Sequence, residues 1–255
     1  MLTVDPKQRF SNRVADYVRY RPGYPREVLD LLREECDLKP DSVIADIGSG
    51  TGILTQLFLE NGNLVLGVEP NVEMRQAGED FLRAYPRFRS VAASAEFTTL
   101  PDASVDLVVA GQAFHWFEPC AARTEFARIL RPGGPVVVIW NERMKDTSPF
   151  LREYEAFLRT FGTDYDKVSE RYPQVQSMED FFGPGAMTKR SFANAQVFDF
   201  DGLRGRLLSS SYSPPKGHAK HEPMLAALLP LFDAHAENGR VRFDYETHVY
   251  YGHIE

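Results

Sequence analysis

The sequence predicts an α/β protein built on a doubly wound, mostly parallel sheet, and two patterns in residues 42–140 lead to that prediction. Five short runs rich in Val, Ile and Leu are too continuously apolar to be half-exposed, as expected of strands that helices cover on both faces. Amphipathic stretches with helical periodicity lie between these runs. This alternation is typical of a doubly wound sheet.

The expected elements follow one another in chain order. We expect strands at residues 42–46, 64–68, 88–92, 105–110 and 135–140, and helices at residues 51–61, 72–85 and 120–130. Residues 7–36 predict two helices, which the Arg21-Pro-Gly-Tyr-Pro25 turn separates. Residues 148–182 and 201–239 predict mainly helices and loops, whereas 195–200 and 246–252 predict a closing antiparallel strand pair.

Composition and charge disfavour several classes of protein. The 255 residues are 43% hydrophobic, and 29 Lys and Arg against 36 Asp and Glu give a net charge of −7. Without a long basic run, neither a nucleic acid nor a membrane partner is expected. The two cysteines, Cys36 and Cys120, have no Cys or His at metal-like spacing, so we expect no disulfide scaffold and no metal site.

The N-terminal residues are charged and lack the apolar stretch of a signal peptide. No apolar run approaches the ~18 residues that a membrane crossing needs. We therefore expect a soluble, cytoplasmic protein.

A glycine-rich loop connects the first strand to the first helix. Gly48, Gly50 and Gly52 let the backbone approach a ligand closely, and Glu69 ends the second strand. A carboxylate in that position can accept hydrogen bonds from both hydroxyls of a ribose. Loop and acid together predict a nucleoside site.

The spacing of the glycines indicates which nucleoside. The dinucleotide fingerprint G-x-G-x-x-G needs a third glycine where this chain has Ile53 or Thr55, which disfavours NAD. Asp46, two residues before Gly48, would repel a pyrophosphate. It suits a cation instead, such as the ammonium and sulfonium groups of S-adenosylmethionine.

Several motifs occur in a characteristic order: RYRPGYP, ADIGSGTG, GVEPN, SAEFTTLPDASVDLVVAGQAFHWF and LRPGG. In this order they resemble the class I S-adenosylmethionine-dependent methyltransferases with a type 11 domain, in the small-molecule branch similar to trans-aconitate methyltransferases. The resemblance covers roughly residues 10–142, and the later residues match only loosely. We therefore expect substrate identity to reside largely in the later part.

The resemblance implies a Rossmann-like, doubly wound, mostly parallel seven-stranded sheet with a closing antiparallel strand pair. It also implies an N-terminal helical lid and a helical C-terminal insertion. Residues 1–40 would form the lid, residues 41–142 the S-adenosylmethionine-binding core, and residues 143–255 a helical substrate-capping region with the last two strands.

The resemblance also implies roles for individual residues. Asp46 would lie near the cofactor ammonium, and Glu69 would hold the ribose hydroxyls. Ser94 stands where many relatives have an acid that contacts the adenine. The full expected cofactor-binding set is Asp46, Gly48, Ser49, Gly50, Gly52, Glu69, Pro70, Ser94, Ala95, Glu96, Gln112, Arg21 and Tyr17.

Arg21 belongs to the segment that folds over the cofactor in relatives. Its guanidinium could neutralise a carboxylate of the cofactor or of the substrate through a two-pronged hydrogen-bonded pair. A solvated helix end is the alternative.

The substrate side is expected around the AGQAFHWF stretch. His115 is a candidate general base, and a hydrogen bond to a substrate oxygen or to backbone is the alternative. Trp116 either walls the transfer site, where its π face attracts the sulfonium, or packs in the core. The expected substrate-contacting residues are Trp116, Asn141, Arg143, Tyr24 and Tyr212.

The predicted function is methyl transfer from S-adenosylmethionine to a small molecule, at an oxygen nucleophile such as a carboxylate or hydroxyl, with S-adenosylhomocysteine as product. A sulfonium methyl group is already activated, so alignment and water exclusion are the main requirements and a base is optional. We expect a monomer or homodimer. The alternatives are a nicotinamide-dependent oxidoreductase and a cofactor-binding module without transferase activity.

Overall fold

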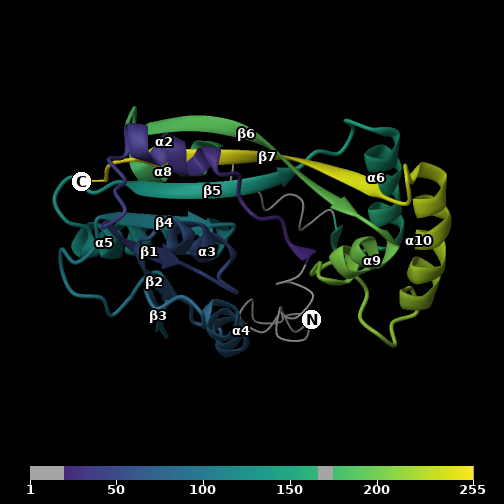
Figure 1. Cartoon of the computed structure of the whole chain (residues 1–255), viewed down its shortest axis with the longest axis horizontal. Coiled ribbons are helices and arrows are strands. Elements are labelled where there is room, and N and C mark those ends of the chain that lie inside the picture. The colour runs from purple at the N-terminus through teal and green to yellow at the C-terminus, as the bar shows by residue number, and fades with distance from the viewer. Residues whose placement is uncertain (1–19, 166–174, 255) are drawn as a thin grey trace.

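A computed structural model describes residues 20–165 and 175–254 of the chain (Figure 1). Tyr17 and the first of the two predicted N-terminal helices lie outside the described residues.

The described residues contain a seven-stranded sheet in the order β3-β2-β1-β4-β5-β7-β6. Strands β1 to β5 run parallel to their neighbours, and β7 runs antiparallel to both β5 and β6. The mostly parallel sheet with a closing antiparallel pair confirms the predicted fold class. The strands are β1 (Val43–Ile47), β2 (Leu64–Val68), β3 (Phe88–Val91), β4 (Leu107–Gly111), β5 (Val136–Arg143), β6 (Met187–Phe198) and β7 (Val241–Gly252).

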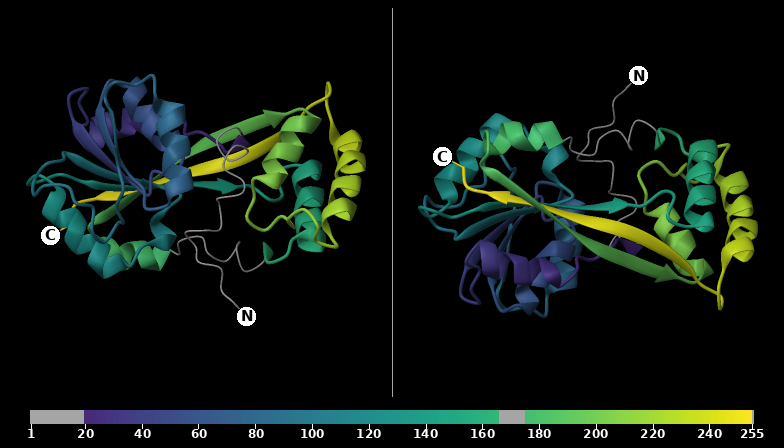
Figure 2. Two further views of the ribbon diagram at one scale, coloured as in Figure 1. Left: turned by 90° about the horizontal axis from the view of Figure 1, so that it is seen from below. Right: turned by 90° about the horizontal axis from the view of Figure 1, so that it is seen from above.

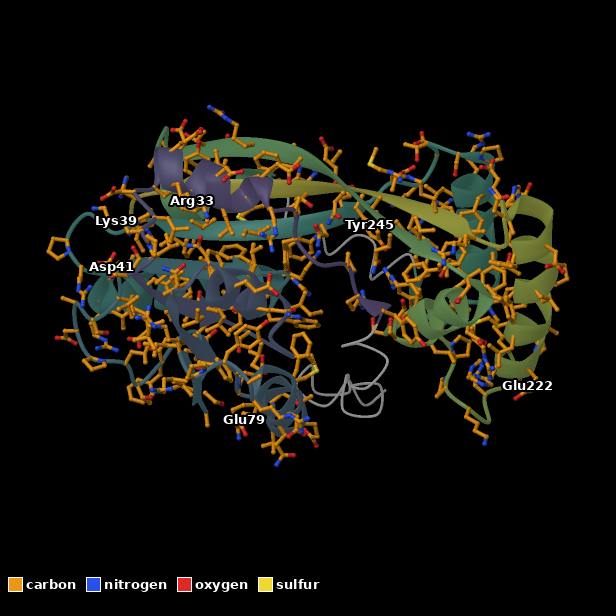
Figure 3. All side chains as sticks on the ribbon, viewed as in Figure 1. Arg33, Lys39, Asp41, Glu79, Glu222 and Tyr245 are labelled. Atoms are coloured by element: carbon orange, nitrogen blue, oxygen red, sulfur yellow. The ribbon has the colours of Figure 1, made fainter. Side chains whose placement is uncertain are left out.

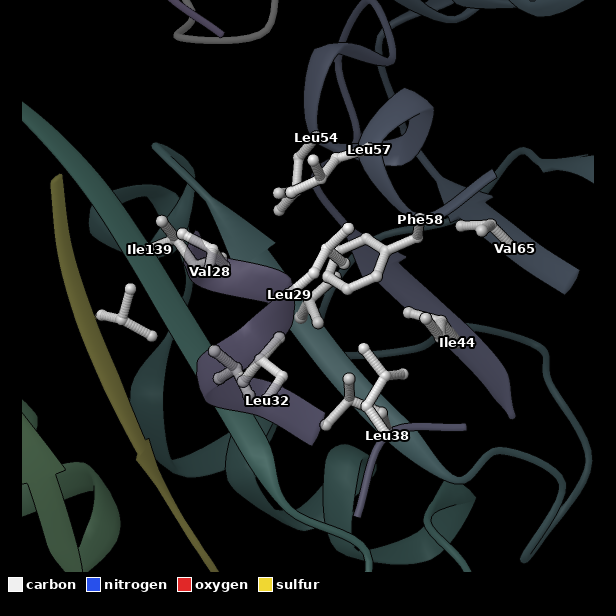
Figure 4. Close-up of a cluster of buried hydrophobic side chains, with 14 of the residues drawn as sticks. Val28, Leu29, Leu32, Leu38, Ile44, Leu54, Leu57, Phe58, Val65 and Ile139 are labelled. Atoms are coloured by element: carbon white, nitrogen blue, oxygen red, sulfur yellow. The ribbon is translucent and has the colours of Figure 1, made fainter. Parts of the chain in front are cut away.

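Helices cover both faces of this sheet, which explains the continuously apolar strands. On one face α2 and α3 pack on side chains such as Ile44 and Val65 (Figure 4). On the other face α5 and α8 pack on neighbouring positions such as Ala45 and Val108. The helices are α2 (Glu27–Glu35), α3 (Ile53–Glu60), α4 (Val72–Leu82), the short 3-10 helix η3 (Phe114–Trp116), α5 (Pro119–Ile129), α6 (Pro149–Phe161), α8 (Val175–Phe182), α9 (Phe200–Leu208) and α10 (His221–His235).

The last two strands are longer than the sequence pattern predicts. They pair over twelve residues each, from Met187 and Val241 onward, whereas we expected starts at residues 195 and 246. The start of β6 carries exposed polar side chains, among them Lys189 and Arg190, because β6 is an edge strand. The predicted strand 195–200 also ends too late, since the Asp199 side chain accepts a hydrogen bond from Gly202 N and begins α9.

Beyond the antiparallel β6–β7 pair lies a second helical unit, which we call the cap: α6, which follows β5, and α9 and α10, which connect β6 to β7. Figures 1 and 2 show these three helices beyond the ends of the core strands, on the opposite side of the molecule from α5. The cap has its own apolar cluster, in which Leu151, Leu207 and Leu228 are fully buried with Phe243 of β7.

The segment of residues 20–25, which we call the strap, crosses between core and cap. The Arg21 Nη2 atom donates to the Ser209 carbonyl at 3.0 Å, after α9. Gly23 O accepts hydrogen bonds from the Asn141 and Asn194 side chains, at 3.1 and 2.9 Å. The strap thereby joins the N-terminal part of the chain to β5, β6 and the cap.

Candidate active site

A cavity of about 480 Å³ lies between the core and the cap, at the carboxyl ends of β1, β2, β4 and β5. This is where open α/β sheets bind ligands. Its wall includes all of the predicted site residues except Gly52, which the structure places elsewhere, and Tyr17, which lies outside the described part.

The glycine loop forms the core side of the cavity with bare backbone. Gly48 N and Ser49 N both donate to the Val68 carbonyl, at 2.8 and 3.1 Å, which ties the loop to the end of β2. Gly48 has φ +69°, and a Cβ atom there would lie 2.6 Å from the Ala113 Cβ. Any larger residue would therefore push the loop and β4 apart.

Gly52 does not line the cavity, so its assignment to cofactor contact has no support in the structure. It precedes α3 with φ +86°, and a Cβ atom there would lie 2.6 Å from Leu82 Cδ1. Its absent side chain serves the close packing of α3 on α4.

Asp46 places a carboxylate under the glycine loop with no exposure to solvent. The Thr55 hydroxyl donates to Oδ2 at 2.6 Å, and Oδ1 has no hydrogen-bond partner among the described residues. Burial raises the pKa of Asp46 to about 7, against the opposing effect of the Thr55 hydrogen bond. A buried oxygen of this kind can accept a hydrogen bond from a cationic ligand.

Glu69 lies at the end of β2 and faces the same space. Its Oε2 accepts from Gly50 N at 2.9 Å and its Oε1 from Asn71 N at 2.8 Å. Burial raises the pKa of Glu69 above its usual value. Each carboxylate oxygen can accept a further hydrogen bond, so both hydroxyls of a ribose find acceptors here.

The AGQAFHWF stretch turns from β4 into the cavity. Gln112 has φ +58°, and its Nε2 donates to the Asn141 carbonyl at 2.9 Å. A Cβ atom on Gly111 would lie 2.5 Å from the Tyr24 hydroxyl, so the missing side chain makes room for the strap. A strained non-glycine residue held at a cavity wall is typical of functional sites.

His115 and Trp116 follow on η3. The His115 ring lies 4.4 Å from the Trp116 ring and 5.1 Å from the Trp140 ring, between centroids. Trp116 is 36% exposed, so the alternative that it packs in the core is wrong. Phe114, in contrast, is buried against Phe181.

Asn141 lines the cavity, but its amide already has partners. Its Nδ2 donates to Gly23 O, and its Oδ1 accepts from the side chains of Thr247 and Asn194. Asn141 therefore holds the strap against the sheet.

The cap side of the cavity contains a group of basic and phenolic side chains. Arg143 Nη2 donates to Glu155 Oε2 and to the Tyr165 hydroxyl. Burial opposes ionisation of Glu155, yet the hydrogen bonds from Tyr165 and Arg143 lower its pKa. Tyr212 meets the Tyr165 ring edge-on at 4.9 Å.

Three basic or phenolic residues of this side were absent from the predicted set: Lys145, Tyr165 and Arg206. Arg206 could have been found, because it lies on the stripe of α9 that also buries Leu203 and Leu207. Charged residues are rarely buried unless they have a partner, so a charged residue on the apolar face of a predicted helix indicates a site.

Charge is thus separated along the cavity. The acidic side chains of Asp46, Glu69 and Glu96 come from the core: from β1, from the end of β2 and from the loop after β3. Basic side chains, Arg21, Lys145, Arg143 and Arg206, come from the strap, from the end of β5 with the loop after it, and from the cap. A cation fits the core side, and an anion fits the cap side. The described residues contain no group of three or more His, Cys, Asp or Glu that could hold a metal ion.

Comparison with known proteins shows to which family the chain belongs. A methyltransferase domain family matches residues 45–138, the strands and loops that form the core side. An uncharacterised methyltransferase of Geobacillus kaustophilus is 32% identical over 74% of this chain and 91% of its own length. The chain belongs to the methyltransferase family.

Other relatives extend the comparison. An uncharacterised methyltransferase of Mycobacterium tuberculosis is 38% identical over 66% of this chain, and the matched region spans 64% of that relative. A solved structure named as a type II methyltransferase from Anaeromyxobacter dehalogenans has a TM-score of 0.66 at 23% identity, and the match covers 91% of the present chain and 97% of that structure's chain. That likeness concerns the fold, which is the class I methyltransferase fold.

The residues present fit S-adenosylmethionine. The bare glycine backbone, the unpartnered Asp46 oxygen and the open acceptor sites of Glu69 match a group with an ammonium, a sulfonium and a ribose. A helix that combines the length and hydropathy of a membrane crossing does not occur in the described part of the chain.

Proposed function

We propose that this methyltransferase transfers the methyl group of S-adenosylmethionine to an oxygen nucleophile of a small molecule, a carboxylate or a hydroxyl. The main support for the proposal is the charge separation along the cavity. The acidic core side suits a cationic cofactor, and the basic cap side suits an anionic acceptor. Bound S-adenosylmethionine would supply an activated methyl group.

The residues of the chain then have separate tasks. Asp46 and Glu69 hold and orient the cofactor, and the strap, with Tyr24, closes the cavity and excludes water. His115 accepts a proton where the acceptor is a hydroxyl, and it positions the acceptor oxygen where that is a carboxylate.

The resemblance to trans-aconitate methyltransferases supports a carboxylate acceptor. The family membership disfavours the oxidoreductase alternative. A cytoplasmic monomer or homodimer with no nucleic acid or membrane partner remains our expectation.

Two measurements test the proposed function. Calorimetry should detect binding of S-adenosylmethionine and S-adenosylhomocysteine, and failure of both to bind contradicts the proposal. Transfer of a radiolabelled methyl group to a panel of carboxylic acids, hydroxy acids and amines should label the first two classes. Labelling of amines alone contradicts the oxygen nucleophile, and cofactor binding without any transfer favours a binding module.

A further inference from the structure

Arg206 is a buried cation in the cavity wall whose hydrogen-bond partners in residues 20–165 and 175–254 are neutral. It is 6% exposed, and its guanidinium donates to the Tyr245 hydroxyl at 3.3 Å and to Ser210 Oγ at 3.0 Å. No carboxylate in the described parts of the chain pairs with it, and the groups that influence its ionisation are tyrosine hydroxyls. Its charge is therefore uncompensated within those parts.

Arg143 shows the contrast. It is buried to the same degree, but Glu155 supplies a counter-charge and Tyr165 a further hydrogen bond at 2.8 Å. A buried ion without a counter-charge is strongly disfavoured. The structure thus keeps one guanidinium neutralised and leaves the other available to the cavity.

The surroundings of Arg206 suit an oxyanion. Tyr212 also lines the cavity and lies close enough to Arg206 for their charges to interact, and its backbone oxygen accepts a hydrogen bond from Thr163 N at 3.1 Å. Burial would raise the pKa of Tyr212, yet the charges of Arg206 and Arg143, together with a hydrogen bond with Ser210 and the charge of Arg21, lower that pKa. Arg206, Arg143 and Arg21 therefore bring positive charge close to the Tyr212 hydroxyl.

We propose that Arg206 and Tyr212 form a subsite for an oxyanion group of the methyl acceptor, a carboxylate or phosphate that is not the group methylated. This inference rests on the proposed function. The bound anion supplies the counter-charge that the described residues do not give Arg206, and a guanidinium matches either oxyanion with two parallel hydrogen bonds.

The anchored group differs from the reacting group for a reason of charge. Methylation of a carboxylate removes its negative charge. If Arg206 held the reacting carboxylate, the product would leave the guanidinium buried against a neutral ester. An acceptor with a separate anion keeps Arg206 paired before and after transfer.

The carboxylate of the cofactor itself is the competing partner. Arg206 extends from α9 of the cap, whereas the glycine loop and Glu69 belong to the core (Figure 1). Tyr245, which accepts a hydrogen bond from Arg206, lies on the stretch of β7 between core and cap (Figure 3). Arg21 of the strap lies in the same cavity and is the alternative partner for the cofactor carboxylate.

Thermal unfolding of the cofactor-free protein tests the subsite. The melting temperature is measured in sodium succinate and in sodium phosphate, and each is compared with sodium chloride at equal ionic strength. The two salts distinguish a carboxylate ligand from a phosphate ligand. We expect at least one of them to raise the melting temperature in a saturable manner. If neither does so with the wild-type protein, the inference is wrong.

Substitutions then assign the subsite. Arg206→Gln should weaken the apparent affinity for the stabilising anion by about tenfold or more, the loss expected for one charge-assisted pair. Arg204→Gln is the matched control, since Arg204 is exposed on the same helix, and it should leave the affinity unchanged. If Arg206→Gln does not fold, Arg206→Lys, which keeps the charge but loses the paired hydrogen bonds, takes its place with the same expectation.

Calorimetry with S-adenosylhomocysteine separates the two proposals. Unchanged affinity of the folded Arg206 variant supports the acceptor subsite, and a large loss assigns Arg206 to the cofactor carboxylate and overturns the inference. Failure of the wild-type protein to bind S-adenosylhomocysteine contradicts the proposed function, while the anion titration still reports on Arg206.

Discussion

The two sides of the cavity are built in different ways. The core side consists of backbone and carboxylates close together in sequence: the glycine loop directly follows β1, and Glu69 directly follows β2. The cap side is assembled from side chains far apart in the chain, such as Arg143, Tyr165 and Arg206. Short motifs therefore describe the first side, and tertiary packing creates the second.

Substitution of a loop glycine should have the largest effect. Gly48→Val places side-chain atoms where Ala113 already lies and forces a β-branched residue to adopt φ +69°. We therefore expect the affinity for S-adenosylhomocysteine to fall more than ~100-fold. Gly217→Ala is the control, because Gly217 has φ +90° with open space around it. Calorimetry measures both variants, and equal affinities would show that the loop does not contact the cofactor.

Disruption of the cap side should act on stability instead. Glu155→Gln removes the counter-charge of Arg143, and we expect the free energy of unfolding to fall by about 2 kcal/mol, because Tyr165 still hydrogen-bonds the guanidinium. Urea denaturation measures the loss, with the exposed Glu34→Gln as control. A loss of S-adenosylhomocysteine affinity without a loss of stability would contradict the separation of the two sides.

Cofactor affinity should depend on pH through Asp46. Burial raises its pKa to about 7 in the cofactor-free protein, so the carboxyl is largely protonated below that pH and ionised above it. Because a cationic ligand prefers the carboxylate, we expect affinity to rise about tenfold between pH 5.5 and 7, below the range in which an α-amino group ionises.

The Asp46→Asn variant should bind more weakly and lose most of this pH dependence, although Glu69, whose pKa is also raised, remains. Calorimetry at several pH values provides the measurement. A wild-type affinity that stays constant across this window would mean that Asp46 does not face the cation.

Substitution of Trp116 should have the smallest effect on ligand affinity. If its half-exposed ring attracts the sulfonium, Trp116→Leu weakens S-adenosylmethionine binding about two- to fivefold, as expected for an exposed cation–π contact. S-adenosylhomocysteine has no sulfonium, so its affinity serves as the internal control. Equal losses for both ligands would indicate simple packing.

The fold was largely predictable because its signals are local. Continuous apolar runs and intervening amphipathic helices placed β1 to β5 and α3 to α5 within a few residues of their observed bounds. The closing antiparallel strand pair was predicted in type but not in length. The polar side chains at the start of β6 are tolerated by its edge position, which only the sheet order reveals.

By itself, the sequence determined the α/β sheet, which follows from periodicity, and the side of the cavity that contains the glycine loop and Glu69. These residues directly follow β1 and β2, so the sequence alone shows where they lie. The tertiary structure alone decided the rest. It moved Gly52 out of the cavity wall and gave Asn141 the task of holding the strap. It also paired Arg143 with Glu155 and left Arg206 facing the cavity without a carboxylate partner among the described residues. The physical reason is that counter-charges come from side chains that meet only after the chain has folded. A local sequence pattern therefore cannot predict which buried cation has a counter-charge.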